Sequence, residues 1–173
     1  MEQLVMRWKK GALPEKPDWR PFVCRTFDGS DADVDAWLDI VAEGLTGKRE
    51  DKAFFLECMN SHGKLEYDKF FIVTCGGEPA ATLAVICDYE KKEGYIHMVC
   101  CKERFRGRGI GTRLNAEAVR TLILSGMETA YLTTDDFRIP AIKSYLRAGF
   151  YPSIINEEHE KRWNDIYDVI GIP

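Results

Sequence analysis

Apolar positions in the first sixty residues predict a short strand and two helices. Phe22–Phe27 reads as a strand, and the turn after it, Asp28–Asp31, supplies side chains that cap helices. A helical spacing of three and four residues follows at Val34, Trp37, Leu38 and Val41. Lys52–Asn60 is predicted to be a second helix. Residues 1–20 contain two prolines, and we expect them to form an extended lead-in.

Three apolar runs in the middle of the chain predict an antiparallel meander. The runs are Phe70–Cys75, Ala80–Tyr89 and Tyr95–Cys101, and the segments between them are rich in turn residues. Parallel neighbours would need a crossover of a dozen or more residues, which these turns are too short to provide.

The last third of the chain alternates helices and strands. Ile110–Ser125 has one broad apolar face and is predicted to be a long helix. A strand at Ala130–Thr134, a helix at Pro140–Ala148 and a strand at Phe150–Ile155 follow. A helix that crosses between two strands makes that pair parallel. The predicted fold class is therefore α/β (mixed α+β), with a sheet that contains both parallel and antiparallel strands.

Composition and charge indicate one globular domain, which we expect to span residues 1–173. The chain is 45% hydrophobic and 30% charged, a balance typical of folded domains. Its net charge of −4 argues against a nucleic-acid partner, because binding to nucleic-acid phosphates depends on Lys and Arg. The sequence shows neither a run of about 20 apolar residues nor a signal-peptide pattern, so we expect no membrane association and a cytoplasmic protein.

The cysteines and histidines form no recognisable metal or disulfide pattern. There are six cysteines and no C-x-x-C pair, and most lie in apolar runs, which predicts buried, reduced thiols. His62, His97 and His159 lie far apart in the sequence, so no metal site is expected.

The segment Lys102–Thr112 predicts a phosphate site. Three glycines in five residues let the backbone approach a ligand closely, and they precede a helix whose N-terminus attracts anions. Arg104, Arg106 and Arg108 add positive charge. The ATP-binding pattern G-x-x-x-x-G-K-[ST] does not occur, and the dinucleotide pattern G-x-G-x-x-G fails at its third glycine.

Two motifs together resemble the GCN5-related N-acetyltransferase (GNAT) family. Arg106-x-x-Gly109-x-Gly111, between a strand and a long helix, is similar to the family's acetyl-CoA signature. Leu132–Phe150, ending in Tyr145-x-x-x-Gly-Phe, is similar to its strand–helix segment. The resemblance implies a mixed, mostly antiparallel sheet of six to seven strands flanked by about four helices. It covers neither residues 1–20 nor the C-terminal extension 156–173, where Glu157–Glu160 reads as a solvated face.

The resemblance also implies a set of residues that bind acetyl-CoA as co-substrate. The strand before the loop would bind the pantetheine arm, and the loop and helix start would bind the pyrophosphate. Arg138 stands where the family often has Asn, and it is a candidate phosphate ligand. The implied residues are Val99, Cys100, Cys101, Arg106, Gly107, Arg108, Gly109, Ile110, Gly111, Thr112 and Arg138.

The implied reaction needs a proton donor and a proton acceptor. Tyr145 is the candidate for protonating the leaving thiolate, with a purely structural core role as the alternative. His97 is the candidate base, because an imidazole titrates near neutral pH, and strand alternation would place it with Tyr95, Val99 and Cys101. A hydrogen-bonded sheet histidine, a water chain and the pair Asp135 and Asp136 are alternatives. For Asp136 we favour helix capping.

The function that these features imply is acetyl transfer from acetyl-CoA to a primary amine by direct attack in a ternary complex. Cys100 and Cys101 could form a covalent acyl-enzyme, but packing of buried thiols is favoured. A non-catalytic acyl-CoA-binding module is the alternative function. The acceptor, a small molecule or a peptide amine, is not encoded in any motif. A homodimer through the last strand is a further expectation.

Overall fold

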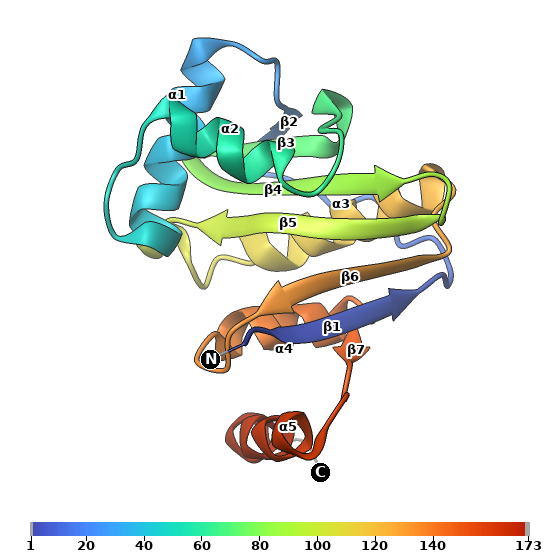
Figure 1. Cartoon of the computed structure of the whole chain (residues 1–173). Coiled ribbons are helices and arrows are strands. Elements are labelled where there is room, and N and C mark those ends of the chain that lie inside the picture. Colours follow the sequence, from blue (N-terminus) through green and yellow to red (C-terminus); the bar gives the residue numbers. More distant parts are fainter. Residues whose placement is uncertain (1, 172–173) are drawn as a thin grey trace.

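A central meander and a helical crossover build one mixed sheet. The computed structural model describes residues 2–171. Its strands are β1 (Leu4–Lys9), β2 (Val23–Thr26), β3 (Phe70–Cys75), β4 (Glu78–Asp88), β5 (Glu93–Cys101), β6 (Thr129–Thr134) and β7 (Tyr151–Pro152). They pair in the order β2-β3-β4-β5-β6-β1-β7 (Figure 1). Only β5 and β6 are parallel, because a helix connects them.

Within residues 2–171, five α-helices lie around the sheet in two layers. They are α1 (Asp31–Val41), α2 (Lys52–Asn60), α3 (Ile110–Leu124), α4 (Ile139–Arg147) and α5 (Glu157–Ile170). One hydrophobic cluster joins α1 and α2 to one face of the sheet, and a second joins α3, α4 and α5 to the other face. The predicted mixed sheet with flanking helices is confirmed. None of the helices between residues 2 and 171 has the length and apolar character needed to cross a membrane.

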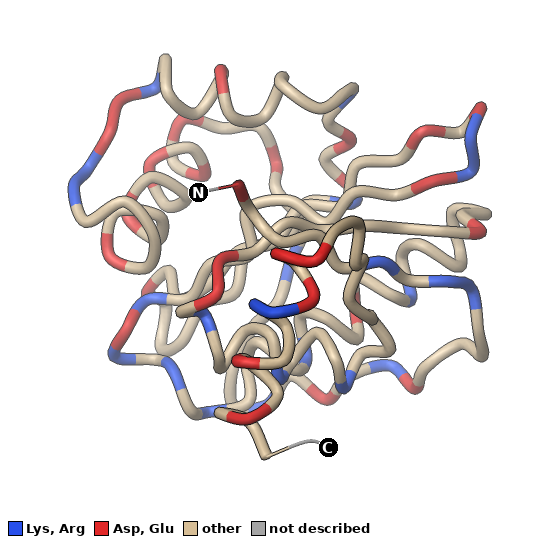
Figure 2. Tube along the Cα trace, turned by 60° about the horizontal axis from the view of Figure 1, so that its bottom comes forward, with Lys and Arg blue, Asp and Glu red and all other residues tan. Residues whose placement is uncertain are grey.

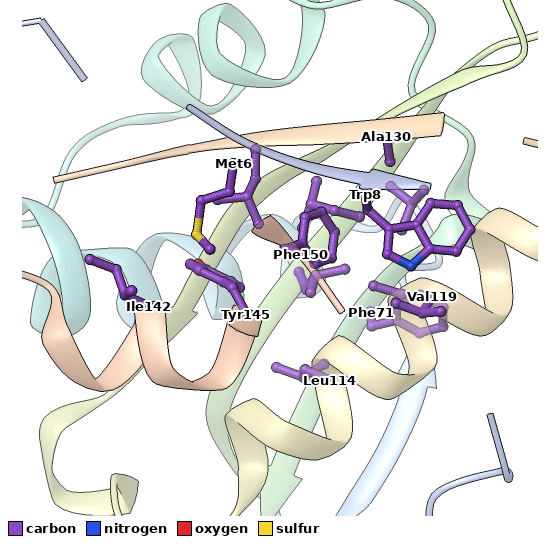
Figure 3. Packing of buried hydrophobic residues seen from close by; sticks show 14 of the residues in the cluster. Met6, Trp8, Phe71, Leu114, Val119, Ala130, Ile142, Tyr145 and Phe150 are labelled. Carbon is purple, nitrogen blue, oxygen red and sulfur yellow. The ribbon is translucent and has the colours of Figure 1, made fainter. Parts of the chain in front are cut away.

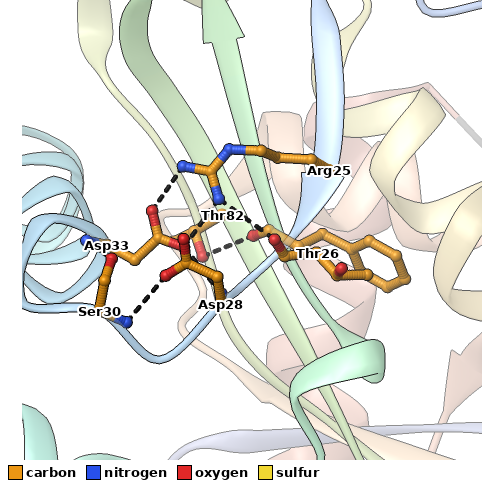
Figure 4. A network of polar contacts seen from close by, with 7 residues as sticks. Arg25, Thr26, Asp28, Ser30, Asp33 and Thr82 are labelled. Carbon is orange, nitrogen blue, oxygen red and sulfur yellow. Dashed lines mark hydrogen bonds and ion pairs between the residues drawn. The ribbon is translucent and has the colours of Figure 1, made fainter.

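A compact polar network starts α1, at the turn that the sequence marks as a helix cap. The Ser30 side chain accepts a hydrogen bond from the Asp33 backbone N–H. The buried Asp33 carboxylate binds the Arg25 guanidinium through two nitrogens, at 2.7 and 2.5 Å (Figure 4). The hydrogen bond from Arg25 lowers the pKa of Asp33, so its charge persists at neutral pH. This pair ties α1 to β2 at the edge of the sheet.

Strands β5 and β6 separate partway along their length. They pair only over residues 93–95 of β5 and 129–131 of β6. Beyond Tyr95, within residues 2–171, the edge of β5 that faces β6 has no strand partner. Polar backbone groups at such an edge must bond to something else, which leaves them available to a ligand. We call this opening the fork.

A β-bulge at Met98 interrupts the predicted alternation of side chains between the two faces of β5. The register between β4 and β5 shifts by one residue here, and Met98 has a φ of +50°. His97 shares a face with Tyr95 as predicted, and its ring lies 5.1 Å from the Tyr95 ring. Val99 and Cys101 instead pack into the cluster on the α3 face. The prediction that they face with His97 is wrong because the extra residue reverses the alternation.

Both ends of the chain are more structured than the sequence predicted. Within the expected extended lead-in, residues 4–9 form β1, a strand of the sheet between β6 and β7. Its alternating residues Leu4, Met6 and Trp8 are buried, with exposed fractions of 0–3%. The expected solvated face at Glu157–Glu160 opens α5, whose Trp163 is fully buried. The last strand is only two residues long, because the chain leaves the sheet after Pro152.

Candidate active site

The predicted anion site is the start of α3. Gly109 caps the helix in the left-handed conformation, with a φ of +77° and no side-chain cap. The first N–H groups of a helix have no partner within it, so those of Ile110, Gly111 and Thr112 are available. Gly107 has open space where a side chain would stand, and a Cβ on Gly111 would meet only Ser144 Oγ, at 3.9 Å. The residues present therefore fit a phosphate group held by backbone N–H groups.

The three loop arginines make different contacts, although the sequence suggested one shared role. Arg106 donates to the carbonyl oxygens of Cys101 and Gly44, at 3.2 and 3.1 Å, and so connects the loop to the π-helical turn Ala42–Thr46. Arg104 forms ion pairs with Glu43 and Glu78. Arg108 has no side-chain hydrogen bond or ion pair within residues 2–171. Arg108 is therefore the arginine of this loop that is free to reach a phosphate.

The strand that is predicted to bind the pantetheine arm ends close to the start of α3. Val99, Cys100 and Cys101 lie on the part of β5 beyond its pairing with β6. All six cysteines are free thiols, as the sequence predicts, but only Cys100 is buried and the other five are partly exposed. Burial raises the pKa of Cys100 to about 12, and it also raises the pKa of Cys101. Because the thiolate is the nucleophilic form, these values favour the packing role over a covalent acyl-enzyme.

Tyr145 lies on α4 and points into the core below β1. Its ring packs near Met6 and lies 6.3 Å from the Phe150 ring (Figure 3). The hydroxyl makes no hydrogen bond within residues 2–171, although 94% of the residue is buried. Burial raises the pKa of Tyr145, against the opposing charge of Arg138. The phenol is therefore neutral at physiological pH and keeps a proton that it can donate.

The polar residues between β6 and α4 are held by ion pairs. Arg138 Nε donates to Asp135 Oδ2 at 2.8 Å. Burial opposes ionisation of Asp135, but the hydrogen bonds from Arg138 and Gln3 outweigh it and lower its pKa. Asp136 accepts hydrogen bonds from Nε and Nη2 of Arg162 and does not cap α4. The predicted cap is wrong because an arginine 26 residues away takes this carboxylate.

His97 is buried on the opposite face of the sheet from Tyr145. Its Nε2 lies 3.0 Å from the carbonyl oxygen of Cys58 and therefore carries the hydrogen of this bond. Burial lowers the pKa of His97 to about 4, so the ring does not titrate near neutral pH as the sequence argument assumed. It is neutral at pH 7, with Nδ1 free to accept a proton. The exposed ring of His62 lies 5.0 Å from it. Nothing in the sequence connects these two residues, because they lie 35 positions apart.

The described residues hold no group of three His, Cys, Asp or Glu side chains arranged to bind a metal. The structure thus brings several features close to one another. They are the free N–H groups at the start of α3, an unpaired strand edge, a buried phenol on one face of the sheet and two imidazoles on the other face.

Comparisons with known proteins agree with this arrangement. A sequence model of the acetyltransferase (GNAT) family matches residues 34–150. An uncharacterised N-acetyltransferase from Methanocaldococcus jannaschii is 34% identical over 92 residues, which cover 50% of this chain and 41% of that protein. The chain thus spans less than half of the length of this relative.

Solved structures share the fold at low sequence identity. A GCN5-related N-acetyltransferase from Sphaerobacter thermophilus has a TM-score of 0.73 and 23% identity, and the match covers 87% of this chain and 48% of that one. Ard1 from Thermoplasma volcanium has a TM-score of 0.61 and 22% identity, with 80% and 90% covered. These similarities concern the fold.

Proposed function

Because the chain belongs to the acetyltransferase (GNAT) family, we propose that it transfers an acetyl group from acetyl-CoA to a primary amine within a ternary complex. The observation that carries the proposal is the uncapped start of α3 beside the fork. A pyrophosphate on the N–H groups of residues 110–112 would place an extended arm along the free edge of β5. When bound, acetyl-CoA supplies the activated acyl group.

Residues of this chain would then act from both faces of the sheet. The phenol of Tyr145, neutral because it is buried, stabilises the departing thiolate by donating a hydrogen bond and then a proton. Free backbone N–H groups of β5 at the fork stabilise the oxyanion. The amine arrives on the other face, where the neutral ring of His97 and the neighbouring ring of His62 lie near the fork. His97 remains our candidate base, acting through its free Nδ1 and directly or through water.

Replacing Tyr145 with Phe tests the catalytic role of the hydroxyl. The change removes one oxygen from a packed ring, so we expect kcat to fall about 100-fold while the affinity for CoA stays within about twofold. Thiol release from acetyl-CoA measures kcat with a panel of polyamines, aminoglycosides, amino acids and peptides, and calorimetry measures CoA binding. Tyr151→Phe on β7, where the ring is exposed, is the matched control. An unchanged kcat would remove Tyr145 from the mechanism, and CoA binding without turnover of any amine would favour the non-catalytic module.

Replacing Gly109 with Glu tests the anion site. A side chain at a φ of +77° is strained, its Cβ would come within 2.8 Å of Arg113 Nη1, and its carboxylate would lie at the start of α3. We expect CoA binding to fall below detection in calorimetry while the far-ultraviolet circular dichroism stays folded. Gly171→Glu, at another left-handed glycine with open space around it, controls for the added strain and charge. CoA binding that survives Gly109→Glu would place the pyrophosphate elsewhere.

A further inference from the structure

A hollow of about 440 Å³ lies on the face of the sheet opposite Tyr145. It is formed between the end of α2 and the turn that joins β4 to β5, and its lining includes His62, Asp88, Glu90, Glu93, Tyr95 and Tyr131. Helices α1 and α2 lie over the other end of this face and leave β6 and β1 open (Figure 1). The hollow is therefore accessible from solvent while the opposite face is filled by core.

The inner wall of the hollow is aromatic. The rings of Tyr95 and Tyr131 stack at 4.7 Å, on paired residues of the last parallel register before the fork. The ring of His62 meets Tyr95 edge-on at 4.6 Å. Aromatic faces bind methylene chains by burial and attract cations through their quadrupole.

The outer end of the hollow is acidic. Asp88, Glu90 and Glu93 line it together with one cation, Lys91. Figure 2 shows acidic residues interspersed with basic ones at the tip of the β4–β5 hairpin, where Lys92 follows Lys91. Lys91 pairs with Asp88 at 2.9 Å and Arg7 with Glu93 at 3.4 Å, but exposed pairs of this kind contribute little and a ligand ammonium can displace them. Glu90 forms no ion pair within residues 2–171.

The inner end of the hollow reaches the proposed reaction centre. Tyr95 is the last residue of β5 paired with β6, and its hydroxyl lies 3.4 Å from Thr133 Oγ1 across the beginning of the fork. His97 follows on the same face. His97 follows Glu93 by four positions, which is about 13 Å along a strand. A long, thin acceptor would thus have one end at the fork and the other among the carboxylates.

We infer that this hollow binds the acceptor, and that the acceptor is a long diamine or polyamine. The reacting amine would lie at the fork, the methylene chain against Tyr95 and Tyr131, and a second ammonium beside Glu90 and Glu93. This inference rests on the proposed acetyl transfer and names the substrate class for it. An acceptor with a distal carboxylate is disfavoured, because it would meet the acidic end.

Three acceptors with the same eight-carbon chain test the inference. Diaminooctane, aminooctanol and aminooctanoate carry a positive, a neutral and a negative group at the end distal to the reacting amine. We expect kcat/KM to fall about tenfold at each step in that order. Equal values for the diamine and the amino alcohol would overturn the inference.

Substitutions of residues that line the hollow test which of them cause the preference for the diamine. Glu90→Gln with Glu93→Gln should reduce the advantage of the diamine over the amino alcohol to about twofold. Glu157→Gln with Glu160→Gln on α5 makes the same change of charge elsewhere and should preserve the advantage. Tyr131→Ala should raise KM for all three acceptors about tenfold with the KM for acetyl-CoA unchanged, and Tyr131→Phe should restore it. A diamine preference that survives the paired Gln substitutions would also overturn the inference.

A binding measurement separates this inference from the proposed function. If no amine is acetylated, calorimetry of diaminooctane and aminooctanol with the wild-type protein still tests whether the hollow binds a diamine. Tighter binding of the diamine, lost in the paired Gln variant, would uphold the site although acetyl transfer fails. Equal binding of the two compounds would reject the site.

Discussion

Burial changes the proton affinities of Tyr145 and His97 in opposite directions and leaves both neutral. It raises the pKa of the phenol and lowers that of the imidazole to about 4, because a low-dielectric surrounding disfavours whichever form is charged. The phenol thereby keeps its proton and the imidazole keeps a free acceptor. Sequence patterns could suggest both residue types, but the direction of each shift depends on the packing around them.

The depressed pKa of His97 predicts a loss of stability in mild acid. Its pKa is about 4 in the folded state and about 6.5 in the unfolded state, so between these values the unfolded state binds more protons. The contribution is complete above about pH 6.5 and is lost as the pH falls towards 4, and it amounts to about 3 kcal/mol. Urea unfolding at pH 7 and pH 4.5 measures it.

The variant His97→Gln isolates this effect from the titration of carboxylates. Glutamine keeps an N–H donor for the Cys58 carbonyl but does not titrate. We expect the variant to lose about 2 kcal/mol less than the wild type between the two pH values. An equal loss in both proteins would mean that His97 is solvated in the folded state.

At the scale of elements, the loop that precedes α3 and the π-helical turn Ala42–Thr46 form one unit. Arg106 donates to the Gly44 carbonyl, and Glu43 pairs with Lys102 at 3.4 Å and with Arg104 at 3.5 Å. The approach is close, because a Cβ on Gly44 would lie 2.3 Å from Cys100 Sγ. The segment between the first two helices is thus connected to the proposed cofactor site.

Two arginines of this loop should give different phenotypes. Arg106→Met removes donors to two carbonyls, so we expect amide exchange in residues 42–47 to accelerate about tenfold. Arg108→Met should leave that exchange unchanged and weaken CoA binding about tenfold, because this guanidinium is free to contact phosphate. Hydrogen exchange by mass spectrometry and calorimetry measure the two effects. Identical behaviour of the variants would show that the loop arginines share one role.

At the scale of the whole molecule, α5 completes the core although it follows the last strand. Trp163 is fully buried, and Arg162 binds Asp136 and the backbone carbonyl of Glu2. The helix therefore connects the C-terminal extension to both the β6–α4 loop and the segment before β1. Its apolar residues occur at helical spacing, but only their packing partners show that this face belongs to the core.

Trp163→Ala should reveal the contribution of α5 to stability. Removing a fully buried indole leaves a large cavity, so we expect the free energy of unfolding to fall by about 3–5 kcal/mol. Val169→Ala on the exposed side of the same helix should change it by less than about 0.5 kcal/mol. Urea denaturation compares the two variants. A small effect of Trp163→Ala would indicate that α5 detaches readily from the domain.

The sequence by itself determined the features that depend on neighbours in the chain. Helix caps, turns and periodicity act over a few residues, and the glycines at the start of α3 act through their own backbone, so α1, the meander and the uncapped start of α3 could all be predicted. That an anion binds there stays a prediction. Tertiary structure decided the bulge at Met98, the place of β1, the carbonyl partners of Arg106 and the meeting of His62 with His97. These depend on contacts between residues far apart in the chain, whose geometry is set only when the sheet and both helical layers pack together.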